Sequence, residues 1–440
     1  MAGMGDGGAV EVGEPVVSYP VTEPNYALIS SFSPDDDPGL ADRLADLERE
    51  WERARERVEA EQRRAASRPS ISLRGRAHLD TALFSGSALE TGNFADNTEN
   101  GTKFRRTRLG ANGGMFDVYR YQIEMDFADS RASFRDVYLE MTDLPLLQTI
   151  RIGHFKEPAS LEELVSSNHI TFMERSVLNA FIPARNVGIQ TSRHNDAQTA
   201  TFAMGFFRDG STTPPTTTNQ NGGNSLTLRG TMLPWYDEAS EGSRLFHAGG
   251  FYSYRDVDRD GLRFRQRPDN SFSDRIVDTG LMADAVDWHL LGVELAMVHG
   301  PFSVQSEYVK ALVTREEAAD PGFDALYVEF SYWLTGEHRV YRRSSGRFDR
   351  VTPHTNFFRI REDDGSISMG PGAWQVAYRF GYIDLIDASV DGGRANVHTM
   401  GLNWHLTRNA RLMANYVHAN RIDEDASYLN AVTMRAQFDF

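Results

Sequence analysis

The chain has 440 residues, of which 40% are hydrophobic and 25% are charged, and its mean hydropathy is -0.46. No segment approaches the roughly 18 uninterrupted apolar residues of a helical membrane span, which excludes a bundle of transmembrane helices. The formal charge of -16 argues against nonspecific binding of nucleic acid, whereas a transmembrane β-barrel stays compatible with these values because its strands are polar on average.

The basic residues are almost all arginines, since Lys103, Lys156 and Lys310 are the only lysines. Two explanations stay open: a GC-rich genome, or selection for the planar guanidinium, which matches phosphate and carboxylate oxygens. The chain has no cysteine, which fits an exported protein. Residues 1–20 lack the basic and apolar regions of a signal peptide, so we expect a mature form or a misplaced start.

Residues 1–37 contain few apolar side chains, and we expect a flexible acidic tail. Residues 38–68 are expected to form a helix with Asp37 as its cap and Pro38 in its first turn. Its apolar residues recur at alternating intervals of four and three, as in a coiled-coil seam. They are Leu40, Leu44, Leu47, Trp51, Ala54 and Val58. Either the helix self-associates into a short coiled coil, or it lies alone against the rest of the chain.

Residues 69–440 repeat one pattern, in which about ten residues alternate between apolar and polar before a turn. In 119–127 the apolar residues are odd-numbered, and Arg120 belongs to the polar set; Arg379 belongs to the polar set of 374–382. Large aromatic residues at strand ends favour lipid outside and water inside over a soluble sandwich. The pattern predicts an all-β fold, a transmembrane antiparallel β-barrel of about sixteen strands. The expected strands run near 71–84, 102–112, 115–127, 131–141, 147–155, 184–193, 197–207, 225–234, 244–255, 286–298, 301–312, 324–335, 372–383, 394–406, 409–418 and 428–440.

The last expected strand alternates up to a terminal phenylalanine, Phe440. Such an ending resembles the signal that the outer-membrane barrel assembly machinery reads. We therefore expect that machinery as a partner during biogenesis, outer-membrane lipid around the barrel, and a periplasmic N-terminus.

Two connections are longer than a turn requires, and we expect inward loops near 156–183 and 256–285. In the first, Ser160 to Glu163 form a capping box that predicts a short helix. An extracellular flap is the alternative for this segment.

In the second loop, Arg263, Arg265 and Arg267 would point to one side of an extended segment and could pass an anion from one guanidinium to the next. Solvated surface arginines are the alternative. Residues 256–261 also match the first half of a calcium loop, with Asp256, Asp258 and Asp260, but Arg267 replaces the glutamate that completes such a loop.

Two further basic runs stand out. Strict alternation sends Arg106 and Arg108 to one face of the second strand and Arg105 to the other. A run from Arg339 to Arg350 lies in a connection that either folds into the lumen or contains an additional hairpin.

Several segments resemble the phosphate-selective porin O and P family. They are 104–109, 153–164, 170–175, 179–181, 185–189, 334–339 and 372–374. The resemblance implies a homotrimer of sixteen-stranded barrels, each with a narrow arginine-lined pore, and a preference for phosphate or polyphosphate. It matches Arg105 and Arg106 to the central constriction, and places Arg263, Arg265 and Arg267 in the loop that carries the arginine ladder.

We therefore expect an outer-membrane porin for passive diffusion of small anions such as phosphate. The expected pore-lining anion contacts are Arg105, Arg106, Arg108, Arg120, Lys156, Arg263, Arg265, Arg267 and Arg379. A general porin, or an outer-membrane anchor tethered by the N-terminal coiled coil, is the alternative. We expect no enzyme activity, cofactor, metal or nucleic-acid partner, because the histidines lack ligand spacing and no catalytic triad or paired carboxylates are apparent.

Overall fold

The computed structural model describes residues 40–67, 69–87, 98–128, 132–208, 223–257, 260–361, 365–423 and 426–440. It divides into two compact units, Met1–Ala65 and Ala66–Phe440. The expected acidic tail 1–37, the expected cap Asp37 and the expected first-turn residue Pro38 lie outside the described residues, as does Asp258 of the calcium-loop pattern.

The first unit contains one long helix, α1 (Leu40–Ser67). On its polar surface, Arg49 forms an ion pair of 2.8 Å with Asp46, which lies about one turn earlier. The seam residues Leu47 and Trp51 are 61% and 45% exposed. The coiled coil stays a prediction. No helix among the described residues is both long enough and apolar enough to span a membrane.

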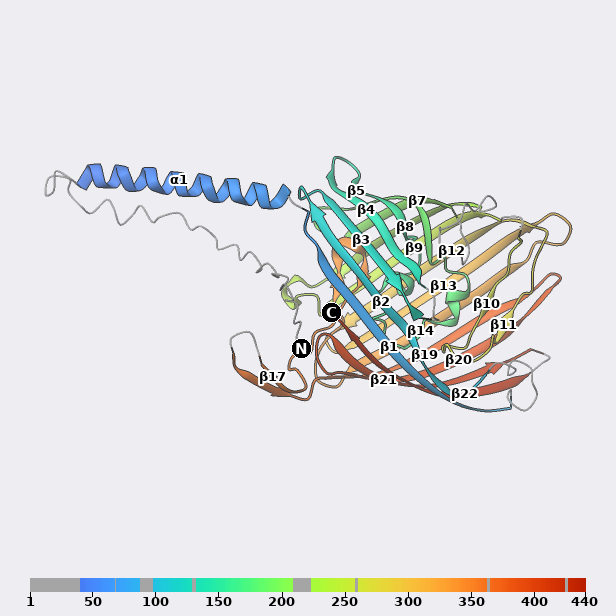
Figure 1. The fold of residues 1–440 in the computed structure, drawn as a ribbon. Helices are drawn as coiled ribbons and strands as arrows, with labels where there is room; N and C mark the ends of the chain where they lie inside the picture. The colour runs from blue at the N-terminus through green and yellow to red at the C-terminus, as the bar shows by residue number, and fades with distance from the viewer. Residues whose placement is uncertain are drawn as a thin grey trace, which may run out of the picture. The chain divides into compact units, whose positions relative to one another are not determined.

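The second unit is a closed barrel of sixteen antiparallel strands, which confirms the predicted fold and strand number (Figure 1). Each strand pairs with its neighbours in the chain, and β22 closes the barrel against β1. The barrel strands are β1 (Ser72–Ser85), β2 (Gly101–Met115), β3 (Tyr119–Asp126), β4 (Ser133–Leu144), β5 (Gln148–Lys156), β6 (Arg185–His194), β7 (Ala200–Arg208), β8 (Asn224–Tyr236), β9 (Arg244–Asp256), β12 (Ala285–His299), β13 (Phe302–Arg315), β14 (Gly322–Trp333), β19 (Ala373–Asp387), β20 (Val390–His405), β21 (Ala410–Arg421) and β22 (Ser427–Asp439).

Alternation separates an apolar exterior from an interior that is polar along much of the wall. On β12, Val293 and Leu295 are 55% and 49% exposed, whereas Glu294 between them is fully buried. Phe440 continues the last strand and exchanges two backbone hydrogen bonds of 3.0 Å with Gly75 of β1. The C-terminus thus lies at one rim of the barrel, called the C-terminal rim below.

Three long connections contain the remaining elements apart from η5, which lies between β8 and β9. The β5–β6 loop (residues 157–184) and the β9–β12 loop (residues 257–284) start at the rim opposite the C-terminal rim, whereas the β14–β19 loop (residues 334–372) starts at the C-terminal rim. The short elements are α3 (Leu161–Leu164), η4 (Val177–Ala180), η5 (Glu238–Ser240), β10 (Arg265–Gln266), β11 (Val277–Asp278), β15 (Tyr341–Arg342), η6 (Arg343–Ser345), β16 (Arg347–Phe348), β17 (Phe358–Arg361) and β18 (Ile367–Gly370).

Two local predictions can be compared directly with these elements. The side chain of Ser160 accepts a hydrogen bond of 3.2 Å from the backbone N–H of Glu163, which confirms the capping box and the short helix. The β14–β19 loop forms two hairpins, β15–β16 and β17–β18, so the basic run from Arg339 to Arg350 lies in and around an additional hairpin.

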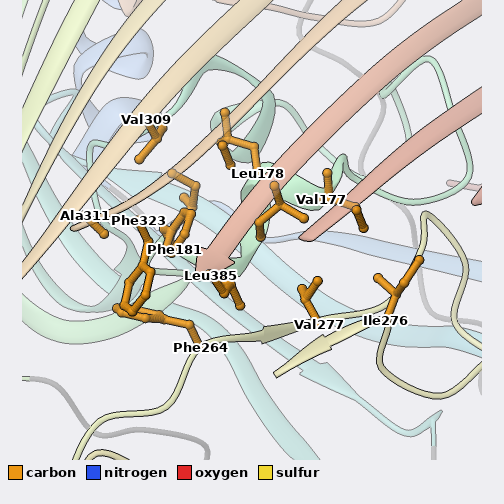
Figure 2. Close-up of a cluster of buried hydrophobic side chains, with 14 of the residues drawn as sticks. Val177, Leu178, Phe181, Phe264, Ile276, Val277, Val309, Ala311, Phe323 and Leu385 are labelled. Atoms are coloured by element: carbon orange, nitrogen blue, oxygen red, sulfur yellow. The ribbon is translucent and has the colours of Figure 1, made fainter. Parts of the chain in front are cut away.

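An apolar core joins two of the long loops to one side of the inner wall (Figure 2). Phe181 of the β5–β6 loop packs edge-on against Phe264 of the β9–β12 loop at 5.0 Å between ring centroids, and Phe264 packs in turn against Phe323 of β14. Inward-facing apolar residues from β12 to β22 complete this core. The loops therefore fill the side of the lumen formed by β12 to β22.

Candidate functional site

The β5–β6 loop is bonded to inward-pointing side chains of the barrel wall. Near its start, Glu157 accepts a hydrogen bond of 2.8 Å from Arg255 of β9. The carboxylate of Glu307 on β13 accepts bonds of 3.0 and 2.7 Å from the backbone N–H groups of Leu161 and Glu162. These contacts satisfy backbone groups that a short helix leaves without intrahelical partners.

Carbonyl groups farther along the same loop bind the opposite strands. Arg411 of β21 donates to Ile170 at 3.0 Å, Asn403 of β20 to Thr171 at 2.8 Å, and Arg435 of β22 to Met173 at 2.6 Å. The loop therefore contacts strands on both sides of the barrel and narrows the lumen between them.

The carboxylate of Glu174 in this loop accepts hydrogen bonds from three arginines. Arg105 binds both of its oxygens at 2.9 and 3.1 Å, Arg106 approaches them at 3.4 and 3.3 Å, and Arg435 donates at 2.9 Å. Burial raises the pKa of Glu174, but the charges of these arginines outweigh burial and hold the pKa well below its usual range. Arg435 also forms two bonds of 2.7 Å with Asp80. We call this group the Glu174 cluster.

The prediction that Arg105 points away from Arg106 is wrong. The register between β1 and β2 shifts, so that His78 pairs with Arg106 while Leu79 pairs with Phe104. Arg105 is the extra residue of this irregularity, and such a bulge redirects a side chain. Both arginines therefore reach the same carboxylate inside the barrel.

A cavity of about 440 Å³ lies between the β5–β6 loop and the wall formed by β1 to β8. Its lining is dominated by basic side chains. They are Arg74, Arg76, Arg105, Arg106, Arg108, Arg135, Arg151, Lys156, Arg175, Arg185, Arg193, Arg229 and Arg347. Among the residues that the structure describes, three carboxylates share this lining, those of Asp136, Glu163 and Asp349.

Most of these basic groups are held by ion pairs. The pairs include Arg76–Glu124 at 2.9 Å, Arg108–Asp126 at 2.9 Å, Arg175–Glu163 at 2.8 Å, Arg185–Asp136 at 2.8 Å, Arg229–Glu294 at 2.7 Å, and Arg151–Glu140. Five further carboxylates pair with these basic groups without lining the cavity themselves: Glu124, Asp126, Glu140, Glu174 and Glu294. With the three carboxylates of the lining, eight carboxylates face thirteen basic groups. The lining and its partners thus carry an excess of five positive charges.

Of the residues expected to line a pore, four line this cavity: Arg105, Arg106, Arg108 and Lys156. Lys156 is held at the end of β5 by an ion pair of 3.2 Å with Glu163. These four come from β2 and β5 and are brought together on one side of the lumen.

The structure places Arg120 and Arg379 elsewhere. Arg120 is exposed near the start of β3. Arg379 is 1% exposed and bonded to both inner loops, to Glu162 at 2.8 Å and to Asp269 at 2.6 Å. Its position therefore suits it to fixing the loops on the wall.

Arg263, Arg265 and Arg267 lie in the β9–β12 loop, outside the set of residues that line the cavity. Arg263 pairs with Asp278 at 2.6 Å, and Arg267 donates to the carbonyl of Ser273 at 2.6 Å. Partial burial lowers the pKa of Arg267, and the neighbouring charges of Arg105 and Arg265 lower it further, although Asp274 opposes them. Arg267 is therefore electrostatically coupled to the Glu174 cluster.

Several lining arginines were missed in the sequence, among them Arg74, Arg76, Arg185 and Arg229. The sequence does indicate an inward position for Arg74 and Arg76, because they occupy the even-numbered, polar positions of the expected strand 71–84. Applying the alternation rule to every strand rather than to a few would have found them.

The β14–β19 loop also enters the lumen. Arg347 donates to the carbonyl of Leu164 at 3.2 Å, and Arg229 donates to the carbonyl of Gly346 at 2.8 Å. Tyr341 bonds to His247 of β9 at 2.7 Å. Side chains from this loop therefore border the same cavity from the C-terminal rim.

The chain has relatives of known family. A sequence model of the family described as "Phosphate-selective porin O and P" matches residues 71–440. Porin O of Pseudomonas aeruginosa is 25% identical over 389 residues, which cover 80% of this chain and 83% of that protein. An uncharacterized protein of Caulobacter vibrioides is 28% identical over 327 residues, which cover 72% of this chain and 62% of that protein.

Solved structures share the fold at low identity. The outer membrane channel DcaP of Acinetobacter baumannii has a TM-score of 0.50 and 14% identity, covering 84% of this chain and 97% of that one. OprB of Pseudomonas putida has a TM-score of 0.51 and 9% identity, covering 84% and 94%. A loop-deletion mutant of OmpT, an outer membrane protein of Vibrio cholerae, has a TM-score of 0.51 and 12% identity, covering 84% and 99%.

Proposed function

The chain belongs to the phosphate-selective porin O and P family, and we propose that its lumen conducts small anions, with phosphate or polyphosphate as the preferred substrates. Membership makes the chain an outer-membrane porin, a channel rather than an enzyme. The anion preference is the part that requires support from this chain's own residues.

The observation that carries the proposal is the charge of the 440 Å³ cavity, where thirteen basic groups face eight carboxylates. Charges that line a narrow passage act on an ion more strongly than the same charges in bulk water. The formal charge of -16 does not oppose this effect, because an ion meets the local groups of the lining.

Arginine suits this task because its guanidinium binds two oxygens of one phosphate group at once. The carboxylate partners keep the guanidinium groups in place and weaken their hold on a passing ion. Conduction requires binding that favours entry yet permits release, and partially neutralised arginines satisfy both conditions.

Competition between phosphate and chloride in single-channel recordings tests the proposal. We expect phosphate added to a chloride solution to reduce the chloride current in a saturable manner. A chloride current that is insensitive to phosphate would remove phosphate as the preferred substrate while leaving a general anion porin.

We also infer a homotrimer whose N-termini lie in the periplasm and whose α1 helices associate. The exposed seam on α1, including Leu47 and Trp51, is the observation that favours association, since an apolar stripe in water is unfavourable. Three barrels packed side by side would bring three such helices close together. An envelope-anchoring role of this coiled coil is the second candidate function.

The outer surface supports the lipid and assembly partners. On β22, Met434 and Phe438 are 53% and 56% exposed and alternate with buried Thr433 and Arg435. Such an apolar exterior is suited to acyl chains. Phe440, 65% exposed at the C-terminal rim, is available to the barrel assembly machinery.

A further inference from the structure

A small cavity of about 30 Å³ lies near the C-terminal rim, on the far side of the β5–β6 loop from most of the basic lining. Its walls come from the ends of β14, β20 and β21 and from two of the long loops. Trp333, His405 and Arg411 line it, together with His169 of the β5–β6 loop. Its lining and that of the 440 Å³ cavity have Asp349 in common.

Buried nitrogen atoms without partners surround this cavity. The Nε atom of Arg411 and the Nε1 atom of Trp333 are both buried and have no hydrogen-bond partner among the described residues. A guanidinium and an indole N–H can only donate hydrogen bonds. The Nε2 atoms of His405 and His169 are buried and unpartnered in the same way. A buried N–H group without a hydrogen bond is energetically costly, so these nitrogen atoms require a hydrogen-bond acceptor inside the cavity.

Charge points to the same conclusion. Arg411 is 3% exposed, and its other nitrogens donate to the neutral acceptors Ile170 O at 3.0 Å and Gln437 Oε1 at 3.2 Å. Within the described part of the chain, Arg411 has no carboxylate in an ion pair, whereas Arg339 and Arg350 of the same lining pair with Glu329 and Asp439. A buried cation without a counterion is strongly unfavourable.

The size of the cavity restricts the class of ligand. One water requires roughly 10–15 Å³, so the cavity of about 30 Å³ accommodates two or three bodies of that size. A tetrahedral phosphate, with five heavy atoms, is too large. We propose that this cavity is a binding site for one small monovalent anion of the halide class, held by Arg411 and Trp333 and bordered by His405.

An exchange route exists for such an ion. A second cavity of about 340 Å³ shares Asn168, His169, Arg350, Arg408, Asn409 and Asp439 with the small cavity. That second cavity also shares Arg74, Arg76 and Ser166 with the arginine-lined cavity. The site is therefore a side pocket next to the ion path, and an anion can reach it from the lumen.

The bound anion would also join two loops. Residues 168–171 of the β5–β6 loop and Asp349 to Val351 of the β14–β19 loop border the site on different sides. Neutralising Arg411 would strengthen the attachment of both loops to the wall. The halide is thus a structural ion of the constriction and is separate from the permeating phosphate.

Crystals of the full-length protein grown in sodium bromide test the site directly. We expect an anomalous peak within hydrogen-bonding distance of Arg411 Nε and Trp333 Nε1. An empty site, or a peak that refines as water without anomalous signal, would overturn the proposal. This result is independent of whether the pore prefers phosphate.

Thermal unfolding in detergent gives a second measurement. In sodium chloride the midpoint should lie a few degrees above that in sodium gluconate of equal ionic strength, because the halide binds only the folded barrel. Two variants test whether the indole N–H is responsible. Trp333→Phe, which removes the indole N–H and keeps an aromatic ring, should abolish this difference between the two salts. Trp374→Phe, at a neighbouring position that stacks on Trp404 and does not line the cavity, should retain it. Equal midpoints of the wild type in both salts, or a full chloride effect in Trp333→Phe, would contradict the site. If Trp333→Phe does not fold, the anomalous map of wild-type crystals grown in bromide and the wild-type melting midpoints in the two salts test the site.

Discussion

Glu174→Gln should make the channel more selective for anions. The substitution preserves the shape of the side chain, replaces one accepting oxygen by an NH2 group and removes one negative charge from the Glu174 cluster. There, Arg105, Arg106 and Arg435 face only Glu174 and Asp80, so the cluster's excess of one positive charge becomes two.

Coulomb's law gives the magnitude. A unit charge about 6 Å from a permeating ion in an aqueous lumen changes the energy of that ion by about 0.7 kcal/mol, with opposite signs for chloride and potassium. The ratio of their permeabilities should therefore change by about 1.4 kcal/mol, or about tenfold. The effect should decrease in about 1 M salt, where the Debye length is only about 3 Å.

The reversal potential across a planar bilayer with a potassium chloride gradient measures this ratio. Glu48→Gln makes the same chemical change at an exposed position on α1 and should leave the potential unchanged. Heat-modifiable gel migration should show that both variants fold as barrels. A folded Glu174→Gln channel with the wild-type reversal potential would refute the placement of the ion path beside the Glu174 cluster.

Three further predictions concern charge, pH and assembly. Replacing Arg106 and Arg265 together by Glu should abolish or reverse the anion preference in bilayer recordings, whereas Arg49→Glu on α1 should be silent; an unchanged double variant would place the ion path away from these arginines. Because the arginines hold the pKa of Glu174 well below its usual range, this carboxylate stays ionised as pH falls from 8 to 5, and the difference in reversal potential between the wild type and Glu174→Gln should be constant over that interval; a difference that disappears near pH 5 would show that Glu174 becomes protonated there. Deleting residues 38–66 should lower the temperature at which trimers dissociate on semi-native gels, as expected from loss of the α1 seam; an unaltered dissociation temperature would argue against a coiled coil.

The barrel could be predicted because period-two alternation is a local property. Strands such as β12 and β22 show it in their own residues, and a barrel needs only neighbouring strands to pair in sequence. The capping box at Ser160 is equally local, because the bond connects residues three apart. Both predictions required no knowledge of distant contacts.

The site was less predictable because it depends on contacts between distant residues. Alternation gave the wrong face for Arg105, since the bulge is set by the pairing of β1 with β2. Arg379 looked like a lining residue from its strand position, but Glu162 and Asp269 from two loops cover it. No local pattern shows which arginines a folded-in loop will cover.

The sequence also indicates which side of the lumen the loops fill, through a pattern that alternation between apolar and polar residues does not capture. Segments 309–313 and 323–326 have apolar residues on both faces, which is unusual for a strand facing water. Val309, Ala311 and Phe323 point inward and pack against the loops. Strands with two apolar faces therefore mark the side of the lumen that the loops fill.

The reversal potential of the wild-type channel shows whether the arginine-lined side of the lumen forms the ion path. In a potassium chloride gradient at about 0.1 M, where screening extends over about 10 Å, we expect a potential with the sign of chloride selectivity. A potential with the sign of potassium selectivity would contradict it, because an excess of positive charge along the path cannot favour cations.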